Sequence, residues 1–129
     1  MAVFLLKVVY MDKAVSNYLE YELRCYKAMK QRQALEDRRQ LDRFTAQDMT
    51  ALERYRRSRY RKHVIEVIEE TYESVDELDR QLIELYYFDN SSVINGDGVA
   101  DKLHISRRDF YNRKQKILDR LGKCLGVES

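Results

Sequence analysis

Residues that interrupt helices and strands are scarce in this sequence. Proline is absent, and glycine occurs only four times, all after position 90, at Gly96, Gly98, Gly122 and Gly126. Because proline and glycine are the residues that most often end a helix, the chain before position 90 can run as long helices. With 129 residues, 36% of them charged, we expect one small all-α domain with a protruding helical arm rather than a compact monomer around a deep core.

Ligands for metals and groups for catalysis are also few. Cys25 and Cys124 are far apart, no Cys-x-x-Cys occurs, and His63 and His104 do not cluster with either cysteine. This pattern is typical of reduced, structural thiols in a cytosolic protein and predicts no metal site and no cofactor. We do not expect an enzyme, because there is no nucleophile elbow, no phosphate loop and no set of carboxylates or histidines at ligand spacing.

Long apolar runs are missing as well. The most apolar stretch, residues 2–11, is interrupted by Lys7 and is too short to span a bilayer. It also lacks the layout of a signal peptide, because no small-residue cleavage site follows it. We expect a cytoplasmic protein with no membrane contact, in which residues 2–11 pack either on the rest of the chain or on a second subunit.

The distribution of charge along the chain is more informative than the net charge of +2. Residues 54–63 are strongly basic and contain no acid, residues 66–84 are acidic apart from Arg80, and residues 99–124 are again mainly basic. Two basic segments therefore flank an acidic one. This order predicts a phosphate-binding face built from the basic segments, with the acidic helix turned away from it or toward a partner.

The first basic segment alternates arginine with tyrosine and has two interpretations. In one, Arg56, Arg57 and Arg59 grip phosphates, and the interleaved tyrosines stack on bases. In the other, the segment is a solvated helix face, stabilised by opposite charges four residues apart, such as Lys62 with Glu66.

Helices are expected along the whole chain before position 90. Residues 12–44 predict one long, highly charged helix, whose apolar edge is formed by Val15, Leu19, Leu23 and Tyr26. A capping residue at Thr45 begins a second helix. The segment Ser74–Glu77 matches a capping box and opens a further helix that ends at Tyr87 and Phe88.

Residues 99–121 are the most informative segment. They predict a short helix, a tight turn and a longer basic helix, the layout of a helix-turn-helix DNA reader. Ser106 is placed to cap the second helix, with Asp109 completing an approximate capping box. Apolar residues at helical spacing predict the face turned to the core, namely Phe110, Ile117, Leu118, Leu121 and Leu125.

The opposite face of this second helix carries side chains that reach base edges, since arginine pairs with guanine, and asparagine or glutamine with adenine. The expected base contacts are Arg107, Arg108, Tyr111, Asn112 and Gln115. Phosphate contacts, which position a protein without reading sequence, are expected from Ser106, Arg113, Lys114, Lys116, Arg56, Arg57 and Arg59. The alternative is an amphipathic basic helix with a solvated polar face.

Several short motifs carry a resemblance to a known family. They are Leu85–Phe88, Leu103–Ser106, the Lys-Ile-Leu-x-Arg-Leu of residues 116–121, and the closing Leu-Gly. Over residues 61–126 the chain resembles phage late-transcription regulators of the RinA and ArpU type and, more distantly, the DNA-binding fourth region of bacterial sigma factors. The segment 91–98 is longer and richer in glycine than the family pattern, which predicts a short first helix in the motif.

The resemblance implies a helical protein of a phage or prophage that acts in the cytoplasm of the bacterial host. Such a protein binds promoter DNA and activates the packaging and structural genes. Activation would further require contact with RNA polymerase, for which the acidic segment 66–84 is a candidate. Because one helix-turn-helix makes few base contacts, we expect a homodimer or higher oligomer on double-stranded DNA. We divide the chain into a helical region 1–60, a candidate oligomerisation arm, and a sigma-region-4-like region 61–129.

Two other functions fit the same features. A small terminase subunit also combines helix-turn-helix DNA binding with helical oligomerisation, and acts in genome packaging. A helical adaptor protein would show no salt-dependent affinity for DNA.

Overall fold

Helices account for nearly all of the structure, a computed structural model that describes residues 12–43, 49–89 and 95–127. The elements in chain order are α2 (Lys13–Arg24), α3 (Tyr26–Arg43), α4 (Met49–Ser74), α5 (Glu77–Ile83), the π-helical turn η1 (Glu84–Phe88), α6 (Gly96–Leu103) and α7 (Arg107–Leu125). No strand occurs in these ranges, so the expected all-α class is confirmed. The expectations for residues 2–11 and for a cap at Thr45 lie outside the described residues.

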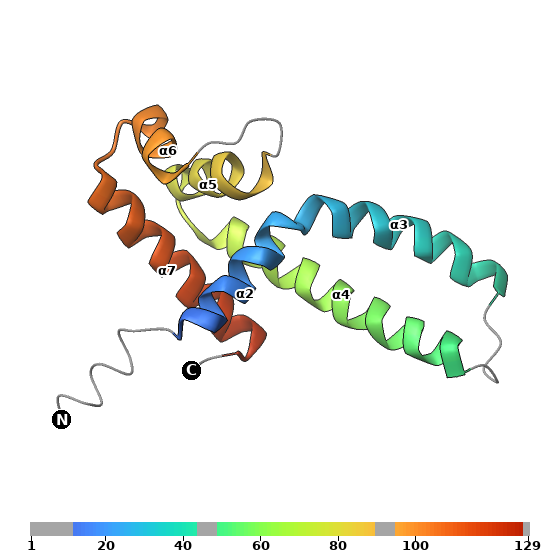
Figure 1. Cartoon of the computed structure of the whole chain (residues 1–129). Coiled ribbons are helices and arrows are strands. Elements are labelled where there is room, and N and C mark those ends of the chain that lie inside the picture. The colour runs from blue at the N-terminus through green and yellow to red at the C-terminus, as the bar shows by residue number, and fades with distance from the viewer. Residues whose placement is uncertain (1–11, 44–48, 90–94, 128–129) are drawn as a thin grey trace, which may run out of the picture.

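Helices α3 and α4 lie side by side and extend as an arm from the rest of the molecule (Figure 1). Polar contacts link them along the arm. The Gln33 amide donates to the Ser58 hydroxyl at 2.7 Å in a buried position. Arg61 pairs with Glu36 at 2.8 Å, and Lys62 pairs with Asp37 at 3.0 Å, adding to the same contact. Few apolar residues follow Met29 in α3. Polar pairs with α4 therefore hold the two helices together along this part of the arm.

The prediction of one continuous helix over residues 12–44 is wrong in one respect. The chain bends at Cys25, which ends α2 and separates it from α3. Figure 1 shows α2 crossing the base of the arm, whereas α3 follows α4. The break has a packing reason, because α2 contacts α7 and η1 while α3 contacts α4, and one straight helix does not reach both.

The core consists of two adjoining clusters of buried side chains. The first joins α2, α4, η1 and α7 through Leu19, Leu23, Val64, Val67, Ile68, Tyr87, Leu118 and Leu121. The second joins α5, α6 and α7 through Leu82, Ile83, Val99, Ala100, Phe110 and Ile117. The half-buried Tyr86 and Phe88 pack against both clusters. The apolar faces expected on the first and last helices are thus the faces that the structure buries, and α2 and α7 share one core.

Of the two helix N-caps predicted within the described residues, one is confirmed. Ser106 caps α7, where its hydroxyl accepts the Asp109 N–H at 3.0 Å, as predicted. The prediction that Ser74 caps α5 is wrong, because Ser74 is still the last residue of α4. The cap is Asp76, whose extended backbone lets its carboxylate accept the Asp79 N–H at 2.8 Å.

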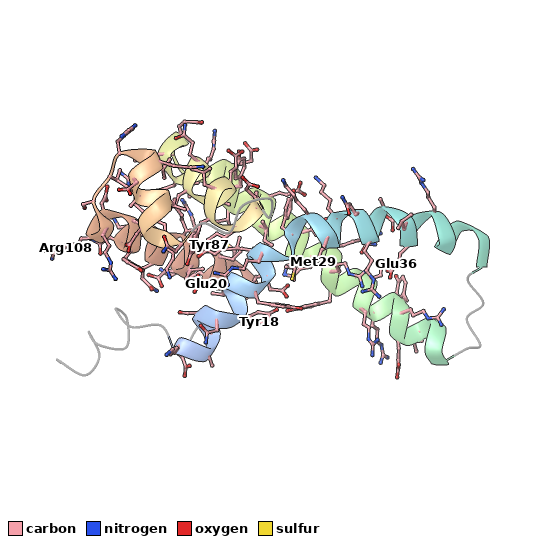
Figure 2. All side chains as sticks on the ribbon, turned by 45° about the horizontal axis from the view of Figure 1, so that its top comes forward. Tyr18, Glu20, Met29, Glu36, Tyr87 and Arg108 are labelled. Atoms are coloured by element: carbon pink, nitrogen blue, oxygen red, sulfur yellow. The ribbon has the colours of Figure 1, made fainter. Side chains whose placement is uncertain are left out.

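The helix predicted to end at Tyr87 and Phe88 does end there, but its last turn is the π-helix η1. The Asp89 N–H donates to the Glu84 carbonyl at 2.8 Å, five residues back, as a π-turn requires. The wider turn accompanies a fully buried Tyr87. The Tyr87 hydroxyl donates to Glu20 at 2.9 Å, so it links η1 to α2 (Figure 2).

The contact between Gly96 and Phe110 generates a stability prediction. A Cβ atom at Gly96 would lie 2.7 Å from Phe110 Cε1, and the Phe110 ring is fully buried. We expect Gly96→Ala to lower the free energy of unfolding by about 1–3 kcal/mol, because the ring has no room to move. Denaturant unfolding measures the loss. The control is Asp101→Ala, on the exposed side of the same helix, with an expected change within about 0.5 kcal/mol; equal stability of the two variants would contradict this packing.

Candidate nucleic-acid interface

The turn between α6 and α7 is short and well defined. It comprises residues 104–106, and α6 itself has eight residues, the short first helix that the sequence predicts. His104 adopts the left-handed conformation, with φ 57° and ψ 41°, which ends α6 in the manner of an αL cap. The Ile105 N–H donates to the Ala100 carbonyl at 3.0 Å. Ser106 then returns to extended backbone and begins α7.

Packing behind the turn determines which face of α7 is open. Val99 and Ala100 of α6 are buried against Phe110 and Ile117 of α7. The opposite face of α7 consequently points to solvent, with Arg108 projecting at one end of the molecule (Figure 2). A small side chain at position 100 is what two closely crossing helices require.

Three of the residues predicted to contact DNA lie on this face. Arg108, Asn112 and Lys116 are exposed and make no hydrogen bond or ion pair with the described part of the chain. Tyr111 is 41% exposed. Two cations lie close to its ring, with the Arg107 guanidinium 5.7 Å and the Lys114 ammonium 5.3 Å from the ring centroid. These residues form an open polar surface on the first three turns of α7.

Two further predicted base contacts have partners within the chain. Arg107 lies 3.3 Å from Asp97, an ion pair across the turn in which both side chains are largely exposed. The Gln115 amide donates to Asp119 at 3.0 Å. The exposed Arg107–Asp97 ion pair is weak, so a ligand that offers a better contact can replace it.

Arg113 is the most heavily paired cation of α7. It lies 3.0 Å from Asp79, 3.2 Å from Asp109 and 3.5 Å from Asp76. Hydrogen bonding to Asp79 raises the pKa of the guanidinium, as does the bond to Asp109. This cluster links α7 to Asp76, the N-cap of α5, and to Asp79 within α5, both of which belong to the acidic segment 66–84.

Lys114 also points inward. Its side chain is 17% exposed and lies 3.6 Å from Glu20 on α2, which is the same carboxylate that accepts the Tyr87 hydroxyl. Glu20 therefore joins α2, η1 and α7. No spacing in the sequence indicates this junction, because the residues that meet there are far apart along the chain. The phosphate contacts expected from Lys114 and Arg113 remain predictions.

Arg56, Arg57 and Arg59 are all exposed on the first half of α4. The Arg59 guanidinium lies 5.9 Å from the centroid of the Tyr55 ring. The beginning of α4 is at the tip of the arm, whereas the beginning of α7 is at the other end of the molecule (Figure 1). Within one chain, the structure does not bring the two predicted groups of DNA contacts together.

Comparisons with family models, curated proteins and solved structures gave no match to this chain. Over the described ranges, no group of three or more histidine, cysteine, aspartate or glutamate side chains is arranged to hold a metal ion. None of the helices described above combines the length and apolar character needed to cross a membrane.

The ion pairs of Arg113 predict a structural contribution from this residue. We expect Arg113→Met to lower the free energy of unfolding by roughly 1–3 kcal/mol, because the half-buried Asp79 carboxylate loses its charged donor. The matched control is Arg108→Met, which removes from the same helix an arginine that has no ion pair with the described residues, and it should change stability by no more than about 0.5 kcal/mol. Chemical denaturation compares the two variants. Equal losses would show that the Arg113 cluster contributes nothing to folding.

Proposed function

We propose that this protein is a sequence-specific DNA-binding transcription regulator of a phage or prophage, acting as an activator of late genes in the cytoplasm of its bacterial host. The observation that carries the DNA-binding part is the pair Arg108 and Asn112, one turn apart on the open face of α7 and free of partners in the described chain. The assignment to late genes, and to RNA polymerase as a further partner, rests on the resemblance of residues 61–126.

Helix geometry supports this proposal. A single α-helix fits the major groove of B-DNA, and a recognition helix contacts base edges with the residues near its N-terminus. Arg108 lies in the first turn of α7 and Asn112 in the second. In this arrangement Arg108 binds a guanine, Asn112 binds an adenine, and the exposed Lys116 binds a phosphate. Tyr111 lies beside them, where its ring contacts a base or sugar.

The α3–α4 arm supports a second candidate function, that of a small terminase subunit. A protruding helical hairpin is a common means of building oligomers, and packaging proteins of this type combine oligomerisation with DNA binding. The two candidates differ in assembly, because a ring favours packaging whereas a dimer favours a regulator. Sedimentation of the purified chain distinguishes them.

Base readout by α7 is tested with two single variants. We expect Arg108→Ala and Asn112→Ala each to weaken binding at the preferred site by roughly 1–3 kcal/mol and to relax specificity there, because each removes a bidentate base contact. Fluorescence anisotropy on phage promoter fragments and on a random duplex measures both affinities. Lys123→Ala, exposed near the end of the same helix, is the control. An equal loss on specific and random DNA would overturn the assignment of the reading face.

Phosphate binding by the arm is tested separately. If Arg56, Arg57 and Arg59 contact phosphates, replacing all three by alanine weakens binding to every duplex alike and reduces the slope of log K against log salt by about 2–3. The same anisotropy titration over a salt series measures the slope. An unchanged slope would mean that these arginines contact no phosphate.

A further inference from the structure

One face of α4 carries four charged side chains and a histidine in a regular pattern. Arg56, Arg59, His63, Glu66 and Glu70 follow one another at alternating spacings of three and four residues, and all five are exposed. This spacing keeps side chains on one line along a helix, as in the seam of a coiled coil. We refer to these five residues as the α4 stripe.

Neighbouring contacts place the α4 stripe away from the rest of the chain. On one side of it, the Tyr60 hydroxyl meets the Tyr18 hydroxyl of α2. On the other side, Glu69 pairs with Lys30 of α3 at 2.7 Å. The stripe lies between these two contacts, on a sector of α4 that no described helix covers.

Charged side chains of α4 that face α3 form ion pairs, whereas those of the α4 stripe do not pair with the described residues. Those turned to α3 are matched within the chain, as in the pairs of Arg61 with Glu36 and Lys62 with Asp37. In the stripe, by contrast, Arg56, Glu66 and Glu70 have no ion pair or hydrogen bond with the described residues, and Arg59 only contacts the Tyr55 ring. The chain therefore pairs the charges along its internal contact and leaves the stripe unmatched.

The order of charge along the stripe is self-complementary. Two arginines precede His63, by seven and four residues, and two glutamates follow it, by three and seven residues. We propose that a second copy of this chain binds here, with its α4 antiparallel to the first about a two-fold axis. Arg56 then faces Glu70 of the second copy, Arg59 faces Glu66, and the two His63 side chains meet at the axis. Each ion pair occurs twice, as two-fold symmetry requires.

A second copy fits this surface better than a nucleic acid or a uniformly charged protein does. From Arg56 to Glu70 the stripe spans about 21 Å, at 1.5 Å per residue. DNA along this length would meet Glu66 and Glu70 as well as the arginines, and a basic partner would meet the arginines. Only a partner surface that is acidic opposite the arginines and basic opposite the glutamates pairs with both halves of the stripe. A partner that places like charges opposite one another is repelled.

Antiparallel pairing has a consequence for the whole molecule. Because α5, η1, α6 and α7 follow the C-terminal end of α4, the pairing places the two α6–α7 units at opposite ends of the joined arms (Figure 1). Exposed ion pairs are individually weak and screened by salt, so association is reversible and strongest in low salt. This proposal does not rest on DNA binding.

Charge reversal on each half of the stripe tests the proposal. We expect the wild-type chain to dimerise in low salt, and Arg56→Glu/Arg59→Glu and Glu66→Arg/Glu70→Arg each to dimerise at least about tenfold more weakly. An equal mixture of the two variants restores a dimer, since one stripe is then wholly acidic and the other wholly basic. Sedimentation equilibrium measures all three, and circular dichroism checks that the variants are folded.

The matched control is Arg54→Glu/Arg57→Glu, which makes the same change of charge on α4 outside the stripe and should leave dimerisation unchanged. A monomeric wild-type chain in low salt, or a mixture of the two stripe variants that does not associate, would overturn the proposal. If no variant self-associates but Arg56→Glu/Arg59→Glu loses DNA affinity, the arginines belong to a phosphate surface instead, and the second copy is excluded.

Cysteine cross-linking tests the register independently. In a Cys25→Ser/Cys124→Ser chain, we expect His63→Cys to form a disulfide between two copies, because this position faces itself. Arg56→Cys alone should not cross-link, since the two copies of residue 56 are about 21 Å apart in this register. Arg56→Cys mixed with Glu70→Cys should cross-link. Efficient cross-linking of Arg56→Cys alone, or none by His63→Cys, would exclude the antiparallel arrangement.

Discussion

The burial of one face of α7 is the constraint on which the rest of the structure depends. Leu118 and Leu121 belong to the cluster shared with α2, α4 and η1, and Phe110 and Ile117 belong to the cluster shared with α5 and α6. Each fully buried side chain of this size contributes about 1.5–3 kcal/mol. Because both clusters use the same face of one helix, α7 cannot rotate without emptying them, and its opposite face is held toward solvent.

Ion pairing then divides the charged residues into two groups. Arg113, Lys30 and Arg61 connect helices within the chain. The partners of Arg113 and Arg61 are partly buried, so these two pairs contribute to stability. Arg108 on α7 and the α4 stripe have no such partners in the described chain. A charged residue of the second group is available to an external ligand.

Much of this organisation was predictable from the sequence, because it depends on local patterns. The all-α class follows from the scarcity of proline and glycine and from apolar residues at helical spacing. The Ser106 cap and the short first helix of the α6–α7 pair follow from near neighbours along the chain. Patterns of this kind are read within one or two turns, where the geometry of the backbone is known in advance.

Other features were decided only by tertiary structure, since they depend on residues far apart in the sequence. The helix break at Cys25 lets α2 pack on α7 and η1 while α3 follows α4. Glu20 receives the Tyr87 hydroxyl and approaches Lys114, a junction without a local signal. Local sequence patterns specify which segments are helical and which of their faces are apolar or charged. Tertiary packing decided which of those charges, Arg113 or Arg108, is paired inside and which is left open, because pairing requires proximity in space.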